Sequence, residues 1–216
     1  MLVPSDPLSD LDPELYRTIQ VRAKQQIRQR MRALRRAIPA EALAERNRAL
    51  LKRVIELPLF EAAQNVALFW PIVTRNEVDL RELDARARAA GKRVFYPFMA
   101  DAGETLRTGF RLAAEATLLC EQGRGFCEPP PDAPEAGAGD LDLIFVPALA
   151  AGPSGHRIGY GAGFYDATLP EFCPPGQSLI VAYDFQLMGE LPVSPIDIAC
   201  NYVVTDKRSL ECAPGA

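Results

Sequence analysis

The chain has 216 residues, of which 48% are hydrophobic and 24% are charged, and its formal net charge is −4. These values are those of a globular domain and exclude a disordered or fibrous chain, and so mild a charge implies no general attraction to nucleic acid. The five cysteines include no Cys-x-x-Cys pair, so we expect free thiols rather than a zinc site or a disulfide framework.

The N-terminal residues carry prolines and acids without the cationic start and apolar core of a secretory signal. No apolar run approaches membrane-spanning length. We therefore expect a cytoplasmic protein without a membrane or nucleic-acid partner. We also expect a monomer or weak dimer. Residues 1–20 are expected to be a flexible leader, 21–206 a single α/β domain and 207–216 a C-terminal tail.

Apolar residues recur every three or four positions from Pro13 onward, which predicts a long helix that ends before Pro39. Its other faces carry several arginines and one lysine, and no acidic residue lies between Glu14 and Glu41 to balance them. Lys24 is one turn from Arg28, so both can reach one polyanion from the same side. A solvated surface and a nucleic-acid patch are the alternatives, although no recognised nucleic-acid-binding module accompanies the helix.

Strands and helices alternate along the rest of the chain. A second helix is predicted from Pro39 to near Pro58, and a third at 80–90, stopped by Gly91. Strands are predicted at 66–70, 92–97, 105–110, 141–146, 178–183 and 202–205. This alternation is typical of an α/β fold in which a mainly parallel sheet is flanked by helices on both faces, a Rossmann-like three-layer sandwich.

The most distinctive stretch is Arg157-Ile-Gly-Tyr-Gly-Ala-Gly-Phe-Tyr-Asp166, in which glycines alternate with larger residues. Glycine accepts positive φ, so this stretch can turn several N–H groups toward one point. A short helix is predicted from Phe164 to Leu169, closed by Pro170. A glycine turn between a strand and a helix N-terminus suits phosphate, although a tight turn without a ligand fits the same pattern.

Two aspartates, Asp166 and Asp197, follow predicted strands and are candidate magnesium ligands, because this ion usually takes one or two carboxylates plus phosphate oxygens. Either one can instead cap a helix or form a turn. The single histidine, His156, makes neither a triad nor a metal cluster by itself. Neither a Gly-x-Ser-x-Gly elbow nor a P-loop is present, which disfavours acyl hydrolysis and P-loop ATPase chemistry.

Several segments resemble the 5-formyltetrahydrofolate cyclo-ligase family. Asp142-Leu-Ile-Phe-Val-Pro147 and the stretch 155–166 are similar to its D-L-I-x-V-P and G-x-R-L-G-x-G-x-G-Y-Y-D motifs. Four weaker segments also match the family in order along the chain, and the matches together cover about residues 20–206: Lys24-Gln-Gln-Ile-Arg28, Asn76-Glu-Val-Asp79, Glu128-Pro129, and Asp184-Phe-Gln186 leading to Leu191-Pro192 and Asp197. The chain departs from the family at Ala151, Gly152, Phe164 and Ala167.

The resemblance implies a role for each matching residue. The residues implied to bind ATP are Lys24, Arg28, Arg157, Ile158, Gly159, Tyr160, Gly161, Ala162, Gly163, Phe164 and Tyr165. Those implied to bind the folate are Arg28, Trp70, Glu77, Tyr160, Gly161, Ala162, Gly163 and Phe164. Arg157, Tyr165 and Asp166 are implied to be catalytic, and Asp166 and Asp197 to hold Mg²⁺.

The implied reaction is the ATP-dependent closure of 5-formyltetrahydrofolate to 5,10-methenyltetrahydrofolate, with release of ADP and phosphate. Two other functions stay open. One is a binding protein that keeps the fold without turnover. The other is an ATP-dependent ligase for another formylated or amide substrate, because the folate side of the motif set is less specific than the phosphate side.

Overall fold

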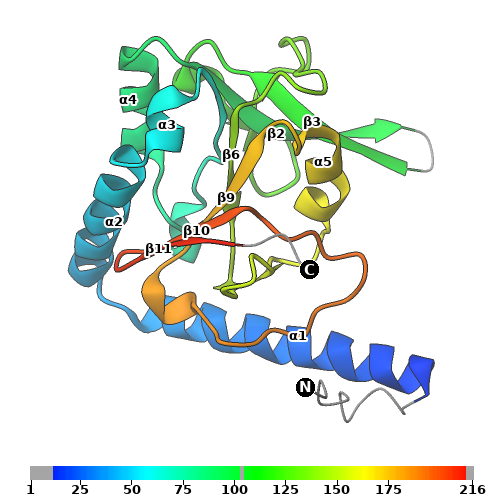
Figure 1. Ribbon diagram of the computed structural model, residues 1–216. Helices are drawn as coiled ribbons and strands as arrows, with labels where there is room; N and C mark the ends of the chain where they lie inside the picture. The colour runs from blue at the N-terminus through cyan, green and yellow to red at the C-terminus, as the bar shows by residue number, and fades with distance from the viewer. Residues whose placement is uncertain (1–11, 103–104, 213–216) are drawn as a thin grey trace, which may run out of the picture.

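A seven-stranded sheet forms the centre of the computed structural model, which describes residues 12–102 and 105–212 (Figure 1). The strand order is β11-β10-β9-β6-β1-β2-β3. The five inner strands are parallel, and the two edge strands pair antiparallel with their neighbours, which confirms the mainly parallel sheet. The strands are β1 (Asn65–Ala67), β2 (Arg93–Ala102), β3 (Thr105–Leu112), β6 (Leu143–Pro147), β9 (Gln177–Val181), β10 (Tyr202–Val204) and β11 (Ser209–Glu211).

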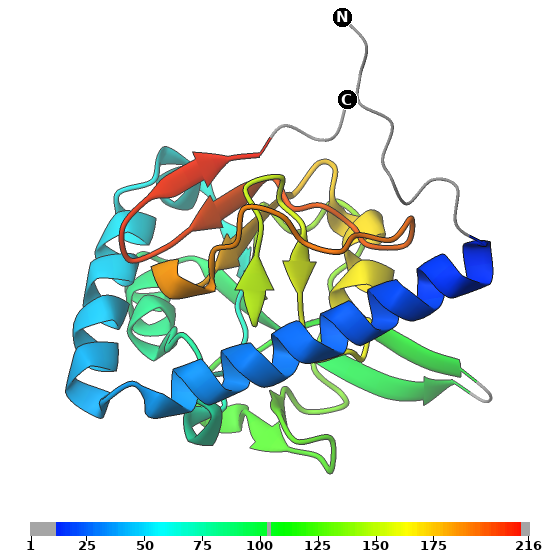
Figure 2. The same cartoon turned by 90° about the horizontal axis from the view of Figure 1, so that it is seen from below.

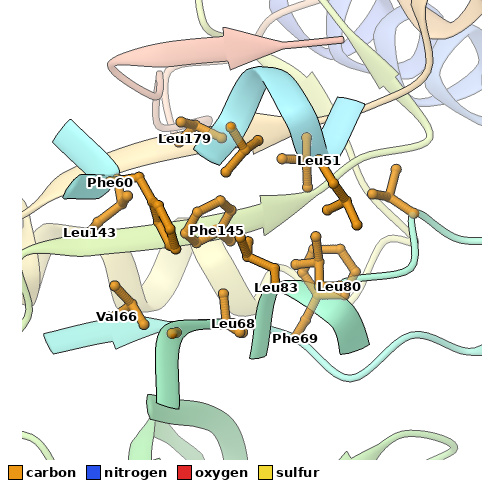
Figure 3. Close-up of a cluster of buried hydrophobic side chains, with 14 of the residues drawn as sticks. Leu51, Phe60, Val66, Leu68, Phe69, Leu80, Leu83, Leu143, Phe145 and Leu179 are labelled. Atoms are coloured by element: carbon orange, nitrogen blue, oxygen red, sulfur yellow. The ribbon is translucent and has the colours of Figure 1, made fainter. Parts of the chain in front are cut away.

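Helices cover both faces of this sheet, as predicted. α2 (Ala40–Ile55), α3 (Pro58–Ala62) and α4 (Arg81–Ala89) pack on one face, and α5 (Phe164–Phe172) packs on the other. Side chains of β6 alternate between the two: Phe145 faces the first layer and Ile144 the second. Figure 3 shows Phe145 among the residues of the first layer, where its ring centroid lies 6.2 Å from that of Phe60 in an edge-to-face arrangement.

The longest helix, α1 (Pro13–Ala37), crosses the molecule outside these layers (Figure 2). It starts where the Asp12 side chain caps its first turn and contacts the 3-10 helix η1 (Val73–Arg75) and the small hairpin of β7 (Ala150–Ala151) and β8 (Arg157–Ile158). Met31 is buried against this hairpin. Because η1 follows β1 and the hairpin follows β6, α1 lies across the carboxyl edge of the sheet.

The remaining elements are short. η2 (Ala116–Leu118) follows β3, and β4 (Cys120–Glu121) pairs with β5 (Cys127–Glu128) in a second hairpin. A third 3-10 helix, η3 (Asp184–Gln186), follows β9. Within the described ranges, no helix is both long enough and apolar enough to span a membrane.

The folded unit extends beyond the predicted range 21–206 at both ends. Residues 13–20 are the first turns of α1, where Gln20 Nε2 donates a hydrogen bond to Val193 O at 2.6 Å. Residues 209–211 form β11, because the Thr205 hydroxyl accepts hydrogen bonds from the N–H groups of Lys207 and Arg208 and so turns the chain back beside β10. Residues 1–11 and 213–216 lie outside the described part of the chain.

Two local predictions are wrong. The glycine-loop helix does not end at Pro170 but continues through it to Phe172, because the buried side chains of Leu169 and Phe172 hold this turn against the sheet. The strand predicted at 66–70 ends at Ala67, although the Leu68 N–H still donates to Phe95 O at 2.9 Å. Burial in the core, which no local pattern states, decides the boundary of the glycine-loop helix.

Candidate active site

The candidate site lies at the carboxyl edge, between the neighbouring strands β1 and β6. From β1 the chain passes through α4 to β2 on one side, and from β6 it passes through α5 to β9 on the other. Such a switch point opens a crevice between two loops that leave in opposite directions, and open α/β sheets bind ligands there. The crevice holds a cavity of about 400 Å³, which α1 borders with Lys24 and Arg28.

The cavity brings together every residue that the sequence assigned to a site. They line it from α1, from the loop after β1 and from the glycine loop: Lys24, Arg28, Trp70, Glu77, Arg157, Ile158, Gly159, Tyr160, Gly161, Ala162, Gly163, Phe164, Tyr165, Asp166 and Asp197. Sequence reasoning missed further lining residues, among them Ile72, Arg75, Met99, Arg124 and Phe126. The only sequence signal for these residues is that they lie between β1 and the Glu128-Pro129 pair.

The glycine loop has positive φ at two of its three glycines. Gly161 has φ 109° and Gly163 has φ 70°, whereas Gly159 lies outside that region. Gly163 is also the N-cap of α5 and supplies no capping side chain, which leaves the first N–H groups of this helix available to an anion. The function of the loop as an anion cradle stays a prediction.

Arg28 lies against the glycine loop. Its Nε donates to Gly159 O at 2.9 Å, and its Cζ lies 3.5 Å from the position that a Cβ at Gly161 would take. A side chain at residue 161 would therefore meet this guanidinium as well as an unfavourable φ. The contact holds a positive charge over the loop.

The guanidinium of Arg157 forms its hydrogen bonds within the protein. Its side chain is only 4% exposed, and its Nη1 donates to Ile198 O at 2.7 Å while its Nη2 donates to Asp166 Oδ1 at 2.9 Å. The Ile198 N–H donates to the same Oδ1 at 3.1 Å. Two donors thus fix one oxygen of Asp166, and they attach it to the residue that follows Asp197.

Asp197 is held in a similar way. Its Oδ2 accepts hydrogen bonds from Ser194 N at 2.7 Å, from Ser194 Oγ at 2.9 Å and from Lys24 Nζ. Burial opposes ionisation of this carboxyl, but the hydrogen bonds from Lys24 and Ser194 outweigh it and hold the pKa of Asp197 below its ordinary value. Asp197 is therefore ionised at neutral pH.

The two carboxylates fit a hard cation. Among hydrogen bonds between described residues, Oδ2 of Asp166 and Oδ1 of Asp197 have no partner, so each carboxylate keeps one oxygen for a ligand. No cluster of three or more His, Cys, Asp or Glu residues suited to a metal occurs in the part of the chain that the structure describes. Mg²⁺ usually takes one or two carboxylates and completes its coordination with phosphate oxygens and water, so the two available carboxylate oxygens fit this ion.

Tyr160, in the glycine loop, is surrounded by arginine side chains. Arg35 donates a hydrogen bond to its hydroxyl, and the Cζ atoms of Arg75 and Arg32 lie 5.0 and 5.5 Å from its ring centroid. Burial, reinforced by the charge of Glu77, raises the pKa of Tyr160 to about 12. The tyrosine is thus a neutral ring among cations.

Part of the cavity wall is apolar. Trp70 packs edge-on against Tyr96, with ring centroids 6.1 Å apart, and Met99 and Phe126 also line the cavity. Glu77 accepts a hydrogen bond from Ile72 N at 2.8 Å and so shapes the loop after β1. A flat heterocycle suits such a wall better than a phosphate does.

Tyr165 has a buried hydroxyl without a hydrogen-bond partner among the described residues. Burial raises the pKa of this phenol, so it remains a protonated donor. A buried donor without a partner is costly, and such groups are uncommon unless a ligand completes them. His156, whose Nδ1 lies 3.1 Å from Ser154 Oγ, is not among the cavity-lining residues.

Comparison with known proteins agrees with this site. Residues 20–206 match the model of the 5-formyltetrahydrofolate cyclo-ligase family. The chain is 31% identical over 185 residues to the 5-formyltetrahydrofolate cyclo-ligase of Escherichia coli (strain K12), covering 84% of this chain and 99% of that protein. It is 45% identical over 82 residues to that of Mycolicibacterium smegmatis, covering 38% of this chain and 42% of that protein.

A solved structure shows the same fold. The NMR structure of Aquifex aeolicus 5,10-methenyltetrahydrofolate synthetase matches with a TM-score of 0.75 and 27% identity, covering 89% of this chain and 94% of that one. The family match spans most of the chain, and the site residues lie within it. The chain therefore belongs to the 5-formyltetrahydrofolate cyclo-ligase family and is a ligase.

Proposed function

We propose that this protein catalyses the ATP- and Mg²⁺-dependent closure of 5-formyltetrahydrofolate to 5,10-methenyltetrahydrofolate, with release of ADP and phosphate. One observation carries the proposal: a single cavity joins an anion cradle, made by the glycine loop and Arg28, to an apolar wall that contains Trp70. A triphosphate suits the first side and a pterin ring suits the second.

The reaction needs alignment rather than a protein nucleophile. The formyl oxygen of the amide is a poor leaving group, so it first attacks the γ-phosphorus of ATP and releases ADP. N10 then attacks the activated carbon and loses its proton, and phosphate departs to leave the methenyl bridge between N5 and N10. Holding two substrates in line and neutralising the transferred charge accounts for catalysis of this type.

Each group of residues has a distinct part in this scheme. The glycine loop, the N-terminus of α5 and Arg28 bind the phosphates, and the ring of Trp70 packs against the pterin. Asp166 and Asp197 would hold Mg²⁺, which would supply positive charge to neutralise the phosphates. The unpaired Tyr165 hydroxyl donates a hydrogen bond to a substrate oxygen.

We assign Arg157 a positioning role rather than a direct contact with phosphate. Both of its terminal nitrogens bond to protein groups, and its side chain is almost fully buried. Its function in this proposal is to hold Asp166 Oδ1 so that the other carboxylate oxygen remains directed at the ligand.

Replacing Lys24 by alanine is expected to raise KM for ATP about tenfold and to change KM for the folate less, because Lys24 borders the phosphate side beside Asp197. Initial-rate kinetics with each substrate varied in turn measures both constants. An exposed lysine of α2, Lys52, provides the matched control, since Lys52→Ala removes the same charge away from the cavity. A larger effect on the folate would contradict this placement.

A panel of substrates distinguishes the proposed cyclo-ligase from a ligase for another substrate and from a non-catalytic binding protein. The purified protein is incubated with Mg-ATP and, in turn, 5-formyltetrahydrofolate, 10-formyltetrahydrofolate and simple N-formyl amides, while phosphate release is measured. We expect release with 5-formyltetrahydrofolate alone. Release with another amide in preference would indicate a different ligase, and binding without release would indicate a non-catalytic protein.

A further inference from the structure

Gln186 joins the two segments that carry the candidate magnesium ligands. It is the last residue of η3, at the start of the loop that runs from β9 to Asp197, and it is 1% exposed. Its Nε2 donates to Ala148 O and to Leu149 O, both at 2.9 Å. These two carbonyl groups follow β6 and begin the segment that leads to Asp166.

The hydrogen bonds of this side chain are complete. Its Oε1 accepts from the Tyr183 N–H at 2.9 Å, while Nε2 serves the two carbonyl groups. Only one orientation of the amide satisfies all three bonds, because the amide oxygen cannot donate. A buried amide with every polar atom paired fixes the backbone around it, since each broken bond would leave a polar group buried without a partner.

One backbone hydrogen bond connects this amide to the glycine loop. Leu149, whose carbonyl accepts from Gln186, donates through its own N–H to Ile158 O at 2.8 Å. The next residue is Gly159, whose carbonyl accepts from Arg28 Nε. The position of Leu149 therefore sets where the glycine loop begins, and with it the position of Asp166.

The loop after η3 runs along the same hairpin on its way to Asp197. Met188 N donates to Ala151 O at 2.8 Å, and Leu191 Cδ1 lies 3.5 Å from the position that a Cβ at Gly152 would take. Figure 2 shows this loop, in orange, passing over the hairpin of β7 and β8. Both candidate metal ligands are thus positioned from the point where η3 meets the end of β6.

We infer that Gln186 is a positioning residue for the metal, which sets the separation of Asp166 and Asp197 by fixing one segment to the other. The inference rests on the proposed function, because that function assigns Mg²⁺ to both carboxylates. The Ile198 N–H, 3.1 Å from Asp166 Oδ1, joins the far ends of the same two segments. The Asp184-Phe-Gln186 segment, to which the family resemblance gives no role, acquires one at its last residue.

The test replaces Gln186 by methionine, which keeps the length of the side chain and removes both donors. The Kd of the ATP analogue AMP-PNP is measured by isothermal titration calorimetry in Mg²⁺ and in EDTA, and the ratio of the two values gives the contribution of the metal. We expect this ratio to fall about tenfold, the lower end of the range for hydrogen bonds behind metal ligands. The Kd of 5-formyltetrahydrofolate is expected to stay unchanged, because the apolar wall around Trp70 lies on other loops.

Asp142→Ala is the matched control for lost stability. The Asp142 carboxylate accepts from Gln64 N and Asn65 N, both at 2.8 Å, so it also joins two segments of the chain through two backbone groups. It does so at the amino edge of the sheet, where β1 and β6 begin. We expect Asp142→Ala to lower Tm and to leave the AMP-PNP ratio unchanged.

Gln186→Glu is the conservative variant. A carboxyl group at this position can donate only when it is protonated, and burial beside two carbonyl groups favours the protonated form. Compared with the unaltered protein at each pH, its AMP-PNP ratio is expected to recover as the pH falls, whereas that of Gln186→Met is not.

An unchanged ratio in Gln186→Met, or an equal fall in Asp142→Ala, would overturn the inference and leave the proposed function in place. Failure of the proposed metal site has a different signature. AMP-PNP binding that is independent of Mg²⁺ in the unaltered protein would remove the metal from the proposed function, and the role of Gln186 with it.

Discussion

An Asp166→Asn variant is expected to lose Mg²⁺-dependent turnover by about 10²- to 10³-fold while keeping its fold, an effect of the size seen when one electrostatic contact to the transition state is removed. The asparagine oxygen can still accept the hydrogen bonds that Arg157 and Ile198 donate to Oδ1. The negative charge is lost, and with it the electrostatic attraction of this carboxylate for a bound cation.

Steady-state rates over a range of Mg²⁺ concentrations, together with thermal unfolding, check this expectation. The exposed Asp132, outside the cavity, gives the control Asp132→Asn with the same change of charge. Asp166→Ala is expected to lose activity as well, but it also leaves the buried Arg157 without its acceptor. Full activity of Asp166→Asn would remove Asp166 from the metal site.

Arg157→Met is expected to lose both stability and activity. The side chain is 4% exposed, and its removal leaves Ile198 O and Asp166 Oδ1 without a strong donor. We expect a cost of about 3 kcal/mol, near the lower end for breaking a buried ion pair because Asp166 is 32% exposed. For a chain of this size, that cost lowers Tm by about 6–12 °C.

A double-mutant cycle with Asp166→Asn distinguishes positioning from direct phosphate binding. If Arg157 acts through Asp166, the two substitutions are not additive, and Arg157→Met costs less in the Asp166→Asn background. If Arg157 instead contacts phosphate, Tm stays unchanged, KM for ATP rises and the cycle is additive. Chemical denaturation and initial rates on the four proteins give both quantities.

The sequence predicts the sheet well because its strands are short apolar runs between amphipathic segments. Phe145 and Ile144, for example, are buried on opposite faces, as expected of a strand covered on both sides. β11 and α3 were not predicted, because neither shows such a pattern. β11 depends on the Thr205 turn, which places it beside β10.

The sequence predicts those residues of the candidate site that belong to one continuous motif. The glycine loop and Asp166 belong to one continuous stretch, and Lys24 and Arg28 lie one helical turn apart. Arg75 and Arg124 are different, because only the tertiary structure places η1 beside the turn between β4 and β5. The same holds for Arg157: its sequence context suggests a phosphate ligand, whereas its burial and partners assign it to Asp166.

The most direct test of the proposed reaction follows the absorbance of the methenyl product when the purified protein is mixed with 5-formyltetrahydrofolate and Mg²⁺, with and without ATP. We expect product only with ATP, one phosphate released for each methenyl group formed, and formation of both about 10²- to 10³-fold slower in the Asp166→Asn variant. Product formed equally without ATP, or phosphate released without product, would show that the proposed reaction is wrong.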